Sequence, residues 1–180
     1  MAWGDRLDTF GVSTAPGGCT GPVDGRGVVL AMEQAPLVVV DAANVVGSVP
    51  DGWWRDRRAA AIRLRDSLAE LATGGLQGAG LPLWAQTAPL DVVLVVEGAA
   101  QGIPGIETVR VVDAPGSGDD AIVDLVQSEG TDRHCLVVTA DRALRARVQA
   151  AGAEVCGPRT VRQPVRQRPA RPTGSGQPGA

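Results

Sequence analysis

The 180-residue sequence contains no lysine and no tyrosine, and all 17 of its basic residues are arginine. The lack of lysine excludes a P-loop nucleotide site, Schiff-base chemistry and a receiver-type phosphorylation site, which uses a lysine beside its aspartate. His134 is the single histidine, so a histidine-rich zinc site is excluded and a Ser-His-Asp triad would depend on this one residue. If the protein catalyses hydrolysis, its carboxylates must therefore do so, and carboxylates catalyse hydrolysis effectively when they hold a hard metal ion.

Cysteine and long apolar runs are also scarce. The three cysteines, Cys19, Cys135 and Cys156, share no metal-binding spacing, and the last two lie in strand-like runs where we expect small hydrophobic core residues. No apolar run approaches the roughly 18 residues that a membrane span requires. Asp5 and Asp8 stand where a signal peptide would be basic. The sequence thus predicts a cytoplasmic protein.

Composition divides the chain into three segments. Residues 1–35 are rich in glycine and show no helical or strand period, which predicts a poorly ordered N-terminal extension. Met32 lies just before the first strong strand and offers an alternative start, in which case residues 1–31 would not be translated. Residues 161–180 are rich in Pro, Gly, Gln and Arg, which predicts a disordered tail. The domain is expected between these ends, at residues 36–160.

Apolar runs alternate with amphipathic segments within this domain. The expected strands are 37–40, 91–96, 108–112, 135–138 and 153–156, and the expected helices are 56–73, 119–129 and 142–151. Such alternation predicts right-handed crossovers and an α/β fold, a three-layer sandwich around a largely parallel sheet of about four to five strands. In sheets of this kind ligands bind beyond the carboxyl ends of the strands.

Acidic residues follow the expected strands. Asp41 ends the first strand, Glu97 ends the second, Asp119 and Asp120 lie beyond the third, and Asp141 lies beyond the fourth. We expect them to converge on one edge, where carboxylates repel one another unless a cation lies among them. Oxygen ligands of this type favour Mg²⁺ or Mn²⁺. Asp41 is the strongest candidate because four apolar residues precede it.

Each acid also has a structural interpretation. Asp141 could cap the helix that follows it, and Ser117-Gly-Asp-Asp120 loosely fits a capping box. Asn44, three residues after the first aspartate, could orient that carboxylate or a water, or could belong to an ordinary turn. Asp124 lies one helical turn beyond Asp120, as a further ligand or as a solvated position, and the solvated interpretation is favoured.

Three motifs in sequence resemble the NYN branch of the PIN-like nucleases. They are Val38-Val-Val-Asp41-Ala-Ala-Asn44-Val-Val, Gly118-Asp-Asp120-Ala-Ile-Val and Val137-Val-Thr-Ala-Asp141-Arg-Ala-Leu. The resemblance spans residues 36–160, in the order of the family, and implies a PIN-like fold and a metal-dependent ribonuclease. It implies that Asp41, Asp120 and Asp141 hold Mg²⁺ or Mn²⁺, with Asp119 as a near alternative to Asp120.

The resemblance also implies roles for further residues of the site, a mode of attack on RNA and an oligomeric state. Asn44 would place a water or a phosphate oxygen. The resemblance implies a further acid, for which Glu97, Glu70 and Asp66 all stay open, and Asp124 is a candidate from its position on the helix. Endonucleolytic attack on RNA is the expected mode, although the sequence does not decide between this and exonucleolytic attack. PIN-like domains often act as dimers, so a homodimer is an expected assembly.

Contacts with RNA are expected from aromatic and arginine residues. Residues 36–157 carry 10 arginines and 16 acids, so RNA would approach an acidic domain. Tryptophan can stack on an unpaired base and arginine can bind phosphate, which makes candidates of five residues: Trp53, Trp54, Arg55, Arg57 and Arg142. Alternatively one tryptophan packs beneath the following helix and the arginines form its solvated first turn, an interpretation that is favoured for each tryptophan taken singly. The chain from Pro158 onward adds five arginines and no acid, a source of nonspecific attraction.

Two other functions remain open. One is an RNA-binding or protein-interaction module that keeps the fold and has lost catalysis, since the family includes such members and fold alone does not settle activity. The other is a phosphohydrolase acting on nucleotides or small phosphoesters. A haloacid-dehalogenase-like enzyme would carry an aspartate two residues after Asp41 and a downstream lysine. Ala43 occupies that position and lysine is absent, which ranks this function below the others.

Overall fold

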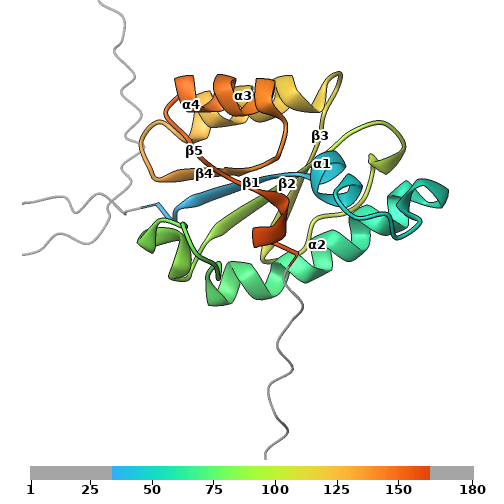
Figure 1. Cartoon of the computed structure of the whole chain (residues 1–180), viewed down its shortest axis with the longest axis horizontal. Coiled ribbons are helices and arrows are strands. Elements are labelled where there is room, and N and C mark those ends of the chain that lie inside the picture. Colours follow the sequence, from blue (N-terminus) through green and yellow to red (C-terminus); the bar gives the residue numbers. More distant parts are fainter. Residues whose placement is uncertain (1–33, 163–180) are drawn as a thin grey trace, which may run out of the picture. The chain divides into compact units, whose positions relative to one another are not determined.

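The apolar runs of the sequence become the strands of one parallel sheet in the computed structural model, which describes residues 34–162 (Figure 1). The strands are β1 (Leu37–Asp41), β2 (Asp91–Val96), β3 (Val109–Asp113), β4 (Cys135–Val138) and β5 (Glu154–Cys156). Their order across the sheet is β3-β2-β1-β4-β5, and every neighbouring pair is parallel. The central strand β1 is buried along its whole length, as expected for a strand covered on both faces.

Helices cover both faces of the sheet, α1 and α2 one face and α3 and α4 the other (Figure 1). They are α1 (Ala42–Gly47), α2 (Arg57–Gly74), α3 (Gly118–Glu129) and α4 (Arg142–Ala150). Alternate residues of β1 serve the two layers: Val38 and Val40 belong to the core cluster under α1 and α2, whereas Leu37 and Val39 belong to the cluster under α3 and α4. The fold is therefore a three-layer α/β sandwich, and the predicted fold class is confirmed.

The expected strands and helices all form, and their ends differ from the expected ones by no more than one residue. Helix α1 was not expected, because the segment after Asp41 was interpreted as a turn. Six residues are too few to show a helical period in a sequence. Short 3₁₀ helices complete the described part of the chain: η1 (Trp53–Arg55), η2 (Leu83–Gln86), η3 (Gly98–Ala100) and η4 (Pro158–Thr160).

The two described cysteines belong to the packed interior. Cys135 is buried in β4, Cys156 is partly buried in β5, and neither forms a disulfide. Burial raises the pKa of the Cys135 thiol to about 11, so the reactive thiolate is scarce at neutral pH. Both residues act as small hydrophobic side chains, as the sequence predicted.

The predicted extension and tail fall outside the described residues, apart from residues 34, 35, 161 and 162. Within residues 34–162, no helix combines the length and the apolar character needed to cross a bilayer.

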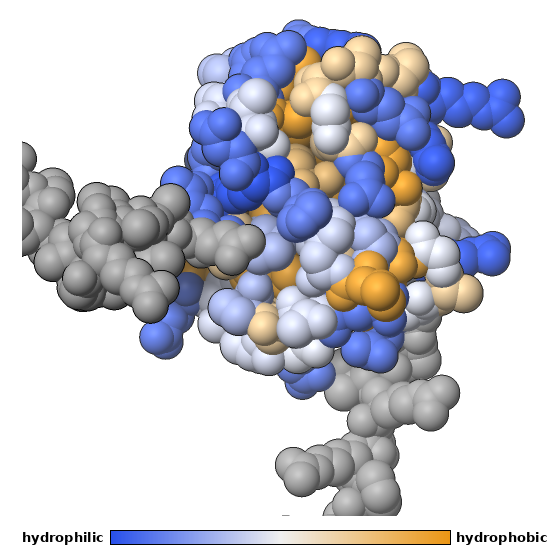
Figure 2. Space-filling view, turned by 90° about the vertical axis from the view of Figure 1, so that its left-hand side faces the viewer, coloured by the Kyte–Doolittle hydropathy of each residue, from blue (hydrophilic) through white to orange (hydrophobic). Residues whose placement is uncertain are grey.

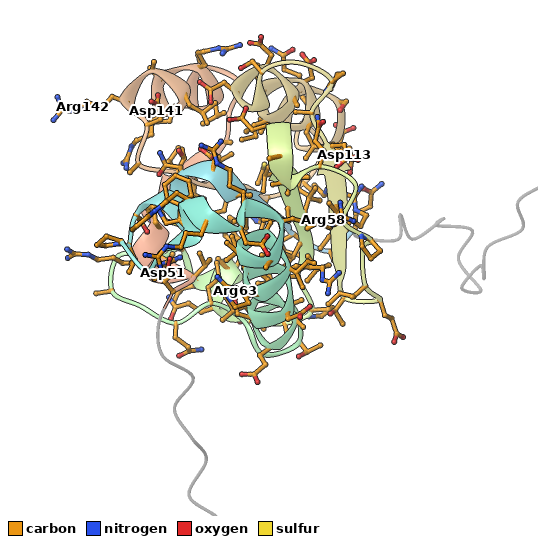
Figure 3. The ribbon with its side chains drawn as sticks, turned by 90° about the vertical axis from the view of Figure 1, so that its right-hand side faces the viewer. Asp51, Arg58, Arg63, Asp113, Asp141 and Arg142 are labelled. Atoms are coloured by element: carbon orange, nitrogen blue, oxygen red, sulfur yellow. The ribbon has the colours of Figure 1, made fainter. Side chains whose placement is uncertain are left out.

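All five strands end at the same side of the domain, the side at which α1 follows β1 in Figure 1. Figure 3 looks onto this end, and Figure 2 looks onto the opposite end, where hydrophilic and hydrophobic residues are mixed over the surface. The parallel register therefore brings the acidic strand ends together, as the sequence predicted.

Candidate functional site

Asp41 stands at the junction of β1 and α1, where it is the last residue of the strand and the N-cap of the helix. Its Oδ1 accepts a 3.0 Å hydrogen bond from the backbone N–H of Asn44, which satisfies one of the free donors of the first helical turn. The side chain of Asn44 reaches across to the β4 loop, where its Oδ1 accepts a 2.8 Å hydrogen bond from the backbone N–H of Ala140. Asp41 therefore caps α1 through Asn44, and the side chain of Asn44 ties the start of α1 to the loop after β4.

Thr139 connects the two aspartates that follow β1 and β4. Its hydroxyl donates a 3.0 Å hydrogen bond to Oδ2 of Asp41 and accepts a 3.1 Å hydrogen bond from the backbone N–H of Asp141. Asp141 in turn caps α4, since its Oδ1 accepts from the N–H of Leu144 at 2.8 Å. Thr139 is fully buried, and sequence analysis gave it no role. A threonine directly after a buried strand could have been noticed, because a buried hydroxyl requires partners.

Glu97, at the end of β2, contacts the start of α3. Oε2 of Glu97 accepts a 2.8 Å hydrogen bond from the backbone N–H of Gly118, the first residue of α3. A Cβ atom on Gly118 would lie 2.8 Å from the same oxygen, so a larger residue here would push the carboxylate of Glu97 aside. The contact holds Glu97 at the positive end of the helix. Ser117 makes no capping hydrogen bond with its side chain, so the capping-box interpretation of this segment is not realised.

These segments enclose a pocket of about 260 Å³ at the carboxyl ends of the strands. Four carboxylates line it, together with one amide and a few small or apolar residues: Asp41, Glu97, Asp119, Asp141, Asn44, Ala43, Val95, Gly118 and Ile122. No basic side chain is among the lining residues. Figure 3 shows Asp141 at the start of α4, with Arg142 projecting outward beside it. The pocket thus gathers four carboxylates on walls that carry no cationic side chain.

Burial and mutual repulsion act on two of these acids. Burial raises the pKa of Asp41, which is 8% exposed, and the charges of Asp119 and Glu97 raise it further, against the opposing effect of the two hydrogen bonds from Asn44 and Thr139. Burial also raises the pKa of Asp119, and the neighbouring charge of Asp141 adds to the effect. A cation in the pocket would relieve both effects, because it favours the ionised carboxylates.

Asp119, rather than Asp120, faces the pocket. Asp120 is exposed, and its Oδ1 pairs with the guanidinium of Arg147 at 2.6 Å. Asp124 is also exposed and does not line the pocket. Consecutive residues of a helix point about 100° apart, so only the seating of α3 on the sheet decides which acid turns inward. The structure therefore brings Asp41, Asn44, Asp119, Asp141 and Glu97 together and leaves Asp120 and Asp124 outside.

The donor set suits a hard divalent cation, since every polar side chain that lines the pocket offers oxygen. Within residues 34–162, no three acidic, histidine or cysteine side chains are grouped closely enough to enclose an ion by themselves. Mg²⁺ commonly takes only one or two carboxylates and completes its coordination with water and substrate phosphate. The residues therefore fit a cation held in part by the protein and in part by water or substrate.

The candidate RNA-binding residues lie outside the lining of the carboxylate pocket, on η1, at the start of α2 and at the start of α4. Trp53 is partly buried against the core, with the guanidinium carbon of Arg57 at 5.5 Å from its ring centre, and it also lines a pocket beside the carboxylates. Trp54 is 53% exposed, and Arg55 is exposed beside it in η1. Arg142 is exposed at the first position of α4 (Figure 3).

Comparison with known proteins bears on the fold. No protein-family model matches the sequence, and no curated protein matches it. The structure is similar to the crystal structure of Rae1 (YacP) from Bacillus subtilis, with a TM-score of 0.53 over 69% of this chain and 70% of that chain. The sequence identity is 18%, and at that level the likeness concerns the fold alone. It agrees with the PIN-like α/β architecture that the sequence led us to expect.

Proposed function

We propose that the carboxylate pocket hydrolyses phosphodiester bonds of RNA with the help of Mg²⁺ or Mn²⁺. The observation that carries the proposal is the convergence of Asp41, Glu97, Asp119 and Asp141 on one pocket whose lining includes no basic side chain. Such a cluster costs stability in the absence of a cation. The resemblance of three sequence motifs to PIN-like nucleases, and the PIN-like fold, agree with this activity.

In this proposal the aspartates hold the cation and the substrate is placed against it. A bound divalent ion supplies Lewis-acid chemistry: it lowers the pKa of a water and offsets charge on the phosphate. Asp41 is fixed for this role by hydrogen bonds to both of its oxygens, which come from Asn44 and Thr139. The side-chain oxygen of Asn44 is engaged by Ala140, which orients its N–H groups as donors for a phosphate or water oxygen.

The exposed arginines near this end would attract the RNA. Arg55 and Arg142 are exposed and make no ion pair among the described residues, so each can bind a phosphate. No histidine base is required, which agrees with the single histidine of the sequence.

Cleavage of an end-labelled single-stranded RNA by the purified protein, with Mn²⁺ or with EDTA, tests this function. We expect cutting with Mn²⁺ that EDTA and the Asp41→Asn substitution abolish, while circular dichroism shows that the variant keeps its fold. Asparagine keeps a side-chain oxygen that can cap α1, so we expect the substitution to leave the fold intact. Wild-type activity in Asp41→Asn would overturn the assignment of the site.

A binding module without catalysis is the second candidate, favoured by the lack of three acids grouped around one point in residues 34–162. Thermal unfolding with and without Mn²⁺ distinguishes the two. A competent site gains about 2.7 kcal/mol of stability when the ion is present at a hundred times its dissociation constant. A module that has lost the metal shows no such gain.

A further inference from the structure

A second pocket, of about 330 Å³, opens beside the carboxylate pocket and shares Ala43 and Glu97 with it. Its walls come from α1, η1, the start of α2, η3 and the loop before α3. The lining residues are Ala42, Ala43, Val46, Trp53, Arg57, Ala61, Glu97, Gly98, Ala100 and Gly116. Most of these residues are small and apolar, and the tryptophan, one arginine and one carboxylate are the exceptions. The volume lies at the lower end of the range for small-molecule sites, about 300–1,000 Å³.

The wall formed by η3 is held in place by Arg58, which is labelled in Figure 3. Its guanidinium donates hydrogen bonds to the backbone oxygens of Gln101 and Gly102, at 2.8 and 2.6 Å. The N–H of Gly102 donates to Asp113 at the end of β3, at 3.0 Å. These bonds tie the loop after η3 to the start of α2 and to the sheet. One wall of the pocket is therefore bonded to both α2 and β3.

The chemistry of the lining suits a flat heterocycle. Trp53 gives an aromatic wall, Arg57 adds a cation within 5.5 Å of that ring, and the alanines and glycines leave room beside it. Aromatic and guanidinium planes are the groups on which proteins stack unpaired bases. Glu97 offers a carboxylate that can accept hydrogen bonds from the N–H groups of a base.

We propose that this pocket binds one unpaired nucleobase of the strand whose phosphate lies in the carboxylate pocket. The inference rests on the proposed function, because it is the shared wall of Ala43 and Glu97 that places the base next to the phosphate. A base within a duplex is stacked and paired, so it can enter such a pocket only after it is flipped out, at a cost of a few kcal/mol that an unpaired base avoids. The substrate class is therefore single-stranded RNA or an unpaired loop.

Gly116 allows the pocket to be filled without disturbing the fold. A Cβ atom at Gly116 meets nothing within 4 Å, and the residue is not in the left-handed region. Leucine at this position would extend into the pocket. Gly74, at the last position of α2, has equally open surroundings and lies away from the pocket. Gly74→Leu is therefore the matched control.

The test measures binding of a short fluorescent oligoribonucleotide by anisotropy in EDTA, so that no cleavage is needed. We expect Gly116→Leu to weaken binding of the single strand about tenfold, within the range found when one stacking contact is lost, and Gly74→Leu to leave it unchanged. The duplex of the same sequence should bind more weakly than the single strand. Equal binding of the single strand by Gly116→Leu and the control would overturn the proposal.

Removal of a single base provides a measurement that depends on no variant. Oligoribonucleotides with one abasic position each, bound to the wild-type protein, should show one position at which affinity falls about tenfold. In Mn²⁺ this position should keep a constant distance from the cut. If no abasic position weakens binding, the base pocket is refuted. If the affinities behave as expected but Mn²⁺ produces no cutting, the nuclease function fails while the base pocket stands.

Discussion

The hydroxyl of Thr139 donates a 3.0 Å hydrogen bond to Oδ2 of Asp41, across a separation of 98 residues in the chain. The same hydroxyl accepts from the N–H of Asp141 at 3.1 Å, so one buried oxygen sets the relative position of two acids of the pocket. Parallel pairing of β1 with β4 brings these residues together. The relationship makes Thr139 a positioning residue of the proposed site.

Replacement of Thr139 by valine should destabilise the protein and lower its activity. Valine keeps the branched shape but removes the hydroxyl, which leaves Oδ2 of Asp41 and the N–H of Asp141 without this partner. We expect the free energy of unfolding, measured by urea denaturation, to fall by about 1–3 kcal/mol. Thr139→Ser keeps the hydroxyl and should recover most of the lost cleavage rate. A valine variant as stable and as active as the wild type would contradict this role.

Substitution of the two adjacent acids of α3 should change the rate of RNA cleavage to very different extents. Asp119→Asn removes a carboxylate that lines the pocket, and we expect the rate of RNA cleavage to fall about a hundredfold or more, because several kcal/mol of catalysis depend on the held cation. Asp120→Asn removes an exposed carboxylate that pairs with Arg147 and lies outside the pocket, so cleavage should change by less than about threefold. Single-turnover rates in Mn²⁺ compare the two variants, each of which is the control for the other. A larger loss of cleavage rate in Asp120→Asn than in Asp119→Asn would show that α3 turns Asp120, and not Asp119, toward the pocket.

The dependence of stability on pH should follow the raised pKa values of Asp41 and Asp119. Both carboxyls bind protons more tightly in the folded protein than at the ordinary value of 3.8, because of burial and repulsion. Their contribution to the free energy of unfolding therefore falls as the pH rises from that value through their folded-state pKa values. We expect Asp119→Asn in EDTA to be more stable than the wild type at neutral pH, and the difference to disappear in acid.

Urea denaturation of both proteins across the acid and neutral range measures this difference, in which the contributions of groups that do not interact with Asp119 cancel. In Mn²⁺ at neutral pH the wild type should become more stable than Asp119→Asn, since the ion stabilises the wild type more than the variant. An Asp119→Asn variant less stable than the wild type in EDTA at neutral pH would show that the charge of Asp119 is not repelled in the folded state.

Much of the fold could be predicted from the sequence because it depends on local patterns. Continuous apolar runs indicated buried strands, alternation with helices indicated a parallel sheet, and acids directly after strands indicated one edge as the site. Asp41 and Asp141 were identified in this way, and both proved to be helix caps as well as pocket residues. The functional and the structural interpretations of these two residues are therefore compatible.

Other features were decided only by the tertiary structure. The choice between Asp119 and Asp120 depends on the rotation of α3 about its axis, which the core contacts of Ile122, Val123 and Val126 determine. The role of Thr139 depends on a contact between segments far apart in the chain. The pocket at Trp53 requires five segments to meet, and no short motif encodes that. The five strands, the three longer helices and the edge at which the acids gather followed from the sequence alone, because apolar runs are local patterns and parallel topology is a general rule. The packing of helices on the sheet decided which side chains face one another, because that depends on shape complementarity over the whole core.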